Sequence, residues 1–190
     1  MASSIPLMQI SMPGQSAPAV GFEEPFGMLS ACHERVERML RLIVRLQEHL
    51  QMQGLDDQVR HAASDVMRYF DVAAPLHHED EERHVFPPLM YGADAAVKAL
   101  VLRLIQDHRQ MEVAWKGARA VLLALAEHDR QQAWGELTVW QKVALNDFAR
   151  LYRQHLDDED RVAYPAARAM LSPEALTLMS EDMMKRRGLG

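Results

Sequence analysis

The sequence predicts an all-α protein that folds as an antiparallel up-down four-helix bundle. The middle of the chain is rich in Leu, Ala, Met, Glu, Gln and Arg, which lose little side-chain freedom in a helix. Apolar residues recur there at helical spacing in four long runs, and breaks containing Gly, Pro or polar residues separate the runs. No run is typical of a strand. Four amphipathic helices with short connections bury their apolar faces as a bundle.

The first helix is expected to run from Pro25 to just before Gly54. Proline is favoured in the first turn of a helix, and glycine commonly follows the last turn. The predicted inward face of this helix is His33, Val36, Leu40, Ile43 and Leu50.

The second helix is expected to run from about Leu55 to Pro87-Pro88, because prolines cannot continue a helix. Pro75 lies inside this run and should bend the helix or start a new segment just before the histidines. The predicted inward face is Val59, Ala63, Val66, Phe70, Ala73, His77 and Glu81.

The third and fourth helices are expected at about Asp94 to Ala126 and about Gln132 to Tyr164. A short loop around residues 91–92 leads into the third helix. Its predicted inward face is Val97, Val101, Leu104, His108, Met111, Trp115 and Leu122. That of the fourth is Leu137, Trp140, Ala144, Phe148, Leu151, His155 and Glu159.

The two ends of the chain are predicted to lie outside the bundle. Residues 1–21 carry no charge and are rich in Ser, Pro, Gly and Met, so we expect an irregular arm that is either loose or laid across the bundle. The bundle itself is assigned to residues 22–170. Residues 171–190 form a short C-terminal helix and tail, for which Ser172-Pro173-Glu174 supplies the N-cap and first turn.

Length, charge and composition limit the classes of protein that fit. The 190 residues suffice for one domain, and 25% charged with 48% hydrophobic residues is ordinary for a soluble protein. The net charge of -6, without a basic patch, argues against nucleic-acid binding. We expect no membrane span and a cytoplasmic protein, because no apolar run reaches about 18 residues and no secretory signal is present. The single cysteine, Cys32, is expected to be a small buried side chain.

Polar residues on the inward faces are the features that need a chemical explanation. Each of the four helices carries one inward histidine, and in two helices a glutamate follows four residues later, on the same face. Buried carboxylates without partners are very costly, so two of them beside four imidazoles call for positive charge. A pair of divalent metal ions supplies this charge, with imidazoles as terminal ligands and carboxylates as bridges. The residues are His33, His77, Glu81, His108, His155 and Glu159.

Each of these residues, taken alone, has a structural explanation. A single histidine on an apolar face is more often a satisfied core residue than a ligand. A lone H-x-x-x-E pair is commonly a surface contact of about 0.3 kcal/mol. The complete set, distributed over four helices, favours the metal interpretation.

Two segments resemble a known signature. HHEDEERHVFP, residues 77–87, resembles the H-H-x-x-E-E-x-x-[LV]-F-P signature of the hemerythrin-like HHE cation-binding domains. HLDDEDRVAYP, residues 155–165, is similar to the second copy of that signature, with Tyr164 in place of the usual Phe. ACHERVERML around His33 and DHRQMEVAW around His108 resemble the single-histidine helices of the family. The resemblance covers roughly residues 25–170.

The resemblance implies a bundle that holds two non-haem iron ions. Zinc or manganese are possible substitutes, because carboxylate-imidazole sites do not select iron by affinity alone. The terminal ligands it implies are His33, His77, His108 and His155, and the bridges are Glu81 and Glu159. His78, Glu79 and Glu82 are expected either to support these ligands by hydrogen bonds or to face solvent.

One position departs from the oxygen-carrying hemerythrins, which have a second histidine one turn from the third-helix ligand. Leu104 and Glu112 stand one turn either side of His108, so this histidine is missing. Either one iron keeps an extra open position or another side chain fills it. Glu112 and His84 are the candidates, and a role on an exposed face is equally open for both.

Three functions fit this pattern. The first is the binding or sensing of oxygen or nitric oxide. The second is a di-iron role in oxidative or nitrosative stress, including iron-centre repair, although the repair proteins usually carry an N-terminal domain with a cysteine pair that this sequence lacks. The third is a metal-buffering or purely structural bundle. We expect metal and oxygen binding rather than turnover, and a protein partner or a homodimer is compatible with all three.

Overall fold

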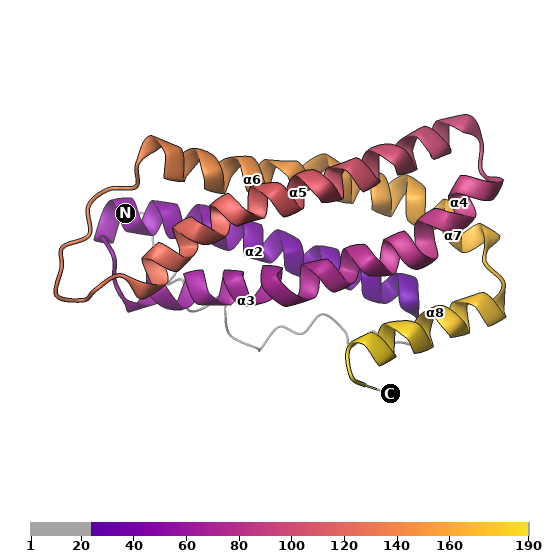
Figure 1. The fold of residues 1–190 in the computed structure, drawn as a ribbon, viewed down its shortest axis with the longest axis horizontal. Helices are drawn as coiled ribbons and strands as arrows, with labels where there is room; N and C mark the ends of the chain where they lie inside the picture. Colours follow the sequence, from indigo (N-terminus) through magenta and orange to yellow (C-terminus); the bar gives the residue numbers. More distant parts are fainter. Residues whose placement is uncertain (1–23, 190) are drawn as a thin grey trace, which may run out of the picture.

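The computed structural model describes residues 24–189, and the predicted arm at residues 1–21 lies outside them. Four helical arms lie side by side and alternate in direction, so the antiparallel bundle is confirmed (Figure 1). Each arm packs against the next along the chain, and the fourth packs back against the first. The long helices of the arms are α2 (Pro25–Gln53), α3 (Asp57–Asp80), α5 (Ala95–Glu127) and α6 (Val139–Asp158).

The boundaries of α2 agree with the prediction, and those of α5 agree within one residue. Gly54 follows α2 with a φ of 79°, a left-handed conformation that favours glycine, and its N–H donates to the Leu50 carbonyl oxygen at 3.1 Å. The Asp94 side chain caps α5 by accepting a hydrogen bond from the Val97 N–H.

The prediction that Pro87-Pro88 ends the second arm is wrong. After α3 the chain makes a π-helical turn, η1 (Glu81–Val85), and continues as α4 (Phe86–Gly92). The two prolines stand in the first turn of α4, where a missing N–H is tolerated. The wider π turn lets Phe86 donate to the Glu81 carbonyl oxygen instead of following the α-helical ladder. The helix α3 also runs through Pro75, so no new segment starts there.

The predicted start of the fourth helix at Gln132 is also wrong. The helix begins at Val139, where Thr138 and Gln141 form a capping box. Trp140, expected inward, is 60% exposed because it stands about 140° around the helix from the fully buried Leu145. The arm extends past its predicted end through a second π turn, η2 (Glu159–Ala163), and through α7 (Tyr164–Met170).

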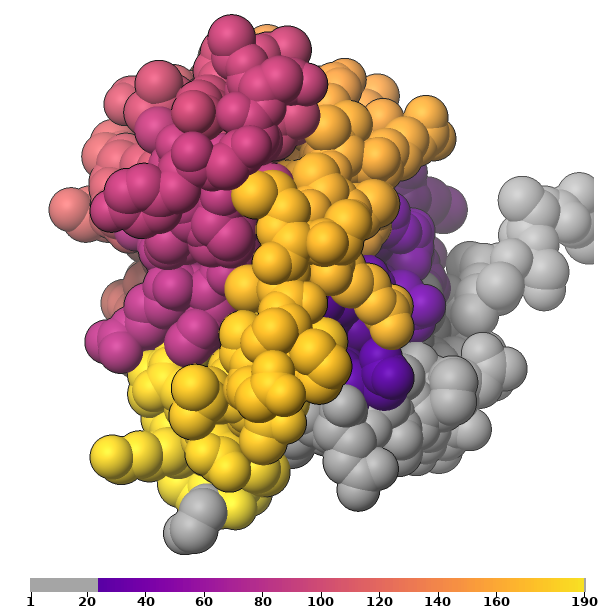
Figure 2. All heavy atoms as spheres, turned by 90° about the vertical axis from the view of Figure 1, so that its right-hand side faces the viewer, coloured from indigo at the N-terminus to yellow at the C-terminus, as the bar shows by residue number. Residues whose placement is uncertain are grey.

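The expected C-terminal helix is present as α8 (Pro173–Arg186), and the Ser172 side chain caps it. Figure 2 shows α8 packed at the end of the bundle that also carries α4 and α7. The side chains of Met179 and Met183 are buried there. The expected division of the chain at residues 21 and 170 stays a prediction. Among residues 24–189, no helix is long and apolar enough to cross a membrane.

A polar layer divides the apolar core into two clusters. The larger cluster includes Val36, Ala74, Met111 and Tyr152, and fills the bundle toward the α2–α3 and α5–α6 connections. The smaller one fills the end with α4, α7 and α8, and includes Leu29, Val85, Phe86, Leu104, Ala163 and Met179. Along the chain, the predicted metal ligands lie where each arm passes from one cluster to the other. The ligands are therefore enclosed by apolar side chains at both ends.

Candidate metal centre

The structure brings all six predicted ligands into one buried centre. Each of the six side chains comes from a different helix or π turn, and none of them is more than 3% exposed. They fall into two groups of donor atoms, each spanning less than 4.8 Å. The first group is His33, His77, Glu81 and Glu159, and the second is His108, His155 and Glu159.

In the first group, two imidazoles meet two carboxylates. The Nε2 atoms of His33 and His77 lie 3.0 Å apart. Glu81 Oε1 is 3.4 Å from the Nε2 of His77, and Glu159 Oε2 is 3.3 Å from that of His33. The donor atoms of one metal, bound at about 2.1 Å, are about 3 Å apart when adjacent, so these spacings suit a shared ion.

The same two glutamates also reach the second group with their other oxygen atoms. Glu159 Oε1 lies 3.0 Å from the Nε2 of His155, and Glu81 Oε2 lies 3.4 Å from that of His108. Each carboxylate therefore offers one oxygen to each group of histidines. This arrangement is compatible with the bridging role predicted for Glu81 and Glu159, which stays a prediction.

The π turns position both glutamates. Glu81 is the first residue of η1 and Glu159 is the first residue of η2. Insertions of this kind in α-helices are frequent at functional sites. Neither π turn was predicted from the sequence. The aromatic-proline pairs that follow them were the available signal, because a proline there needs the backbone ladder to change.

Three acidic residues outside the groups contact the remaining nitrogens of the histidine rings. Asp160 Oδ2 lies 3.0 Å from the Nδ1 of His33, and Glu82 Oε1 lies 3.0 Å from that of His108. Asp107 approaches His155 Nδ1 at 3.5 Å. Such contacts orient each ring so that its Nε2 faces the centre.

The pKa values of the histidines in the centre are shifted in different directions. Burial disfavours the charged form of His33, but Asp160 and Glu159 outweigh it and raise the pKa of His33 to about 10. Burial is likewise outweighed at His108, where the two central glutamates raise the pKa to about 10. Burial and the charge of His33 hold the pKa of His77 well below its usual range. The raised pKa values of His33 and His108 favour a proton on each of these rings at neutral pH.

The two glutamates have opposite shifts. Burial and the neighbouring Glu159 charge raise the pKa of Glu81. Burial disfavours the charge on Glu159 too, but His155 and the other histidines outweigh it and hold its pKa well below the usual range. The depressed pKa of Glu159 therefore favours a charged carboxylate at neutral pH.

The donor set passes a test for bound metal. Among the residues that the structure describes, both carboxylate oxygens of Glu159, Oε2 of Glu81 and Nε2 of His108 are buried and form no hydrogen bond, although charged groups lie close by. Buried polar atoms without partners are costly, and most find one in a native protein. These four atoms all face the centre. Metal ions bound there would satisfy them.

Comparison with known proteins agrees with this geometry. The family model described as hemerythrin HHE cation binding domain matches residues 24–167. The chain belongs to the hemerythrin family. An uncharacterized protein of Haemophilus influenzae is 31% identical over 180 residues, which cover 95% of this chain and 98% of that protein. The family and the clustered donor atoms together indicate a cation-binding centre.

Neither predicted substitute for the missing histidine of the oxygen-carrying hemerythrins joins the centre. The side chain of Glu112 is 58% exposed and accepts a hydrogen bond from Arg109. His84 lies 2.8 Å from Asp182 on α8, through its Nε2. Both residues act outside the donor groups.

Two residues of this hemerythrin domain contact the centre without having been predicted as ligands. The Tyr164 hydroxyl lies 2.9 Å from the Nε2 of His33 and donates a hydrogen bond to Glu81 Oε1. His78 stacks on the ring of His108 with centroids 3.9 Å apart. The sequence marked Tyr164 as a departure from the signature, but its distance from Glu159 in an ordinary α-helix gave no reason to place it inward.

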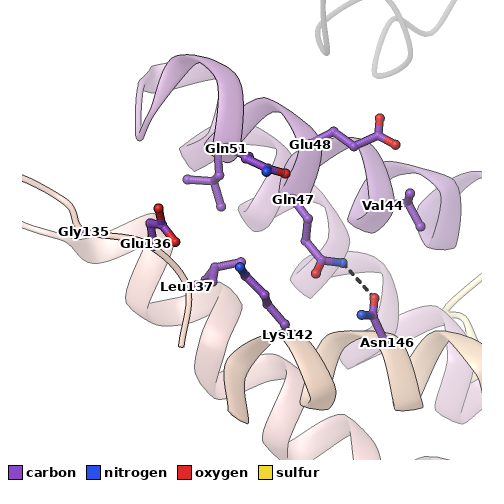
Figure 3. Close-up of a pocket in the computed structure, with 10 residues that line it drawn as sticks. Val44, Gln47, Glu48, Gln51, Gly135, Glu136, Leu137, Lys142 and Asn146 are labelled. Atoms are coloured by element: carbon purple, nitrogen blue, oxygen red, sulfur yellow. Dashed lines mark hydrogen bonds between the residues drawn. The ribbon is translucent and has the colours of Figure 1, made fainter. Parts of the chain in front are cut away.

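Other features of the hemerythrin bundle lie away from the centre. A hollow of about 250 Å³ opens between α2, α6 and the loop before α6, and the side chain of Gln47 donates to Asn146 across it (Figure 3). Gln47 is 14 residues past His33, about 20 Å along the helix. Cys32 is buried as expected, and burial raises the pKa of its thiol.

Proposed function

We propose that this hemerythrin-family protein binds or senses oxygen or nitric oxide at a carboxylate-bridged di-iron centre. The observation that carries the proposal is the placement of Glu81 and Glu159, each with one oxygen toward either pair of histidines. Carboxylate and imidazole ligands together suit iron, and zinc or manganese are the substitutes to test. Two ferrous ions, when bound, would supply the electrons and open positions that such a ligand needs.

The protein surrounds the centre with groups that hold its ligands still and exclude water. Asp160 and Glu82 fix the rings of His33 and His108. The two apolar clusters enclose the centre on both sides along the bundle axis. A site of this kind admits a small uncharged ligand more readily than an ion, because burial of a charge without a partner is costly.

A small cavity provides an approach to the second donor group. It has a volume of about 60 Å³, enough to admit a few molecules the size of water. Its walls are mostly apolar, with the exposed Pro75 and Glu112 among them. His78 also lines it and stacks on His108, so the cavity ends one ring away from a predicted ligand. This position supports access by a diatomic molecule.

The same geometry weighs against metal buffering as the main role. A buffer exchanges its ions with the surroundings, whereas the six ligands here are at most 3% exposed. A role in oxidative or nitrosative stress would use the same ligand-binding centre, and repeated consumption of the bound ligand would distinguish it from carriage or sensing.

The first experiment is metal analysis of protein from iron-supplied cells, followed by anaerobic reduction and addition of oxygen or nitric oxide. We expect two irons per chain and a change in visible absorbance that reverses when the ligand is removed. One metal per chain or none contradicts the di-iron centre. Two irons without any response contradict ligand binding. Steady ligand consumption with added reductant would favour turnover.

A further inference from the structure

The two aromatic residues that follow the π turns differ by one hydroxyl group. Phe86 follows η1 and lies against the ring of His108, with centroids 5.7 Å apart. Tyr164 follows η2 and stacks on the ring of His33 at 5.2 Å. The two aromatic rings thus have corresponding places in the two halves of the centre. Only the half with Tyr164 gains an extra oxygen donor from this position.

The π turn explains why this oxygen reaches the centre. Tyr164 is five residues after Glu159, which in an α-helix would place it about 140° away around the axis. The N–H of Tyr164 instead donates to the Glu159 carbonyl oxygen, five residues back, so the π turn brings the two residues onto one face. Tyr164 is 4% exposed, and its side chain is directed inward.

The Tyr164 oxygen has the spacing of a ligand relative to the first donor group. It is 2.9 Å from His33 Nε2, while the two histidine Nε2 atoms of that group are 3.0 Å apart. It also contacts Glu81 Oε1, the bridge oxygen that faces the same group. Adjacent donors to an ion at about 2.1 Å are about 3 Å apart, so the hydroxyl lies where a further donor would lie.

From these contacts we propose that Tyr164 is a further ligand, binding ferric iron held by His33 and His77. The inference rests on the proposed di-iron centre and deepens it. On coordination the phenol O–H bond breaks, its proton leaves to solvent, and the oxygen lone pair forms the bond to iron, with no change in the number of electrons on the metal. The hydroxyl no longer donates to Glu81, whose oxygen becomes a ligand of the same ion.

This additional ligand makes the two ions unequal. The first ion has five protein donors, and the second has four, because Phe86 offers no oxygen. The donors of the first are one atom each from His33, His77, Glu81, Glu159 and Tyr164. Those of the second are one atom each from His108, His155, Glu81 and Glu159. An external ligand therefore binds to the second ion, the one near the cavity beside His78.

The test is visible and resonance Raman spectroscopy of the full chain, loaded with ferrous iron and oxidised with ferricyanide. We expect a phenolate-to-iron charge-transfer band whose ring vibrations shift when the protein is made with ring-deuterated tyrosine. The band should disappear in Tyr164→Phe while two irons per chain remain. It should persist in Tyr152→Phe, which removes another buried hydroxyl close to His78.

Two irons per chain without tyrosine ring vibrations in the wild-type spectrum would overturn the proposal and leave Tyr164 as a hydrogen-bond donor. Survival of the band in Tyr164→Phe would overturn it as well. The wild-type measurement decides the question even if the variant fails to fold. Loss of iron from the wild-type protein would instead count against the di-iron centre itself, so the two failures are distinguishable.

Discussion

The two segments that carry Glu81 and Glu159, residues 77–87 and 155–165, share a backbone plan but have different surroundings. Each begins with a ligand histidine, places its glutamate at the start of a π turn, and ends with an aromatic residue and a proline. In each, the residue after the glutamate contacts the Nδ1 of a histidine on another helix. The shared features place each glutamate between the two groups of histidines.

The differences between the segments concern what anchors each of them. Asp80, just before the first bridge, is fully buried and accepts hydrogen bonds from Arg186 and Arg187 at the end of α8. Its counterpart Asp158 pairs with Arg103 of the adjacent α5, nearer to the solvent. The first segment is therefore held by the C-terminal helix, and the second by its neighbour in the bundle. Both segments thus carry a central glutamate, whereas the arginines that anchor the two segments come from different helices.

The largest expected effect is on metal content, and it compares the contributions of Glu81 and Glu159. Glu81→Ala or Glu159→Ala should lower the metal content from two ions per chain to one or none, because each carboxylate contacts both donor groups. Metal analysis of purified protein measures this. The control is Glu79→Ala, in the same segment but partly exposed. Two ions per chain in either bridge variant would remove that residue from the site.

A large effect on stability is expected when the two arginines that contact Asp80 in the first segment are replaced. Replacing Arg186 and Arg187 by Ala leaves the Asp80 carboxylate buried without its partners, which should lower the free energy of unfolding by about 3 kcal/mol. Arg103→Ala, at the counterpart Asp158, should cost less than about 1 kcal/mol because Arg103 is 45% exposed. Urea unfolding of the metal-free proteins compares them. Equal losses would mean that α8 gives the first segment no special support.

The third prediction concerns protons in the two halves of the centre. His33 and His108, whose pKa values are raised to about 10, carry protons at neutral pH and must lose them to bind metal. Metal affinity should therefore rise with pH between 6 and 9, by about tenfold per unit for each proton released. Titration of metal-free protein with zinc at several pH values measures it. An affinity independent of pH would show that the histidines are already neutral.

The sequence predicted which side chains gather in the core better than it predicted the backbone that holds them. Inward histidines and glutamates at helical spacing on four helices indicated the six residues that the structure clusters, and their role as metal ligands stays a prediction. The π turns insert a residue that the apolar pattern does not reveal, and both predicted ends near Pro87 and Tyr164 were consequently wrong. The hydroxyl of Tyr164 and the partners of Asp80 could not be predicted, because they depend on that turn and on where α8 packs.

The smallest effect is expected from the contacts that the two segments share. Glu82→Ala and Asp160→Ala each remove the partner of one histidine Nδ1, and each should weaken metal binding by about tenfold without changing the number of ions. Competition with a chelator of known affinity measures this. If the segments correspond, Glu82→Ala should affect mainly the ion at His108, and Asp160→Ala mainly the ion at His33. Loss of both ions together in either variant would instead show that the two donor groups bind metal as one unit, with the bridges coupling them.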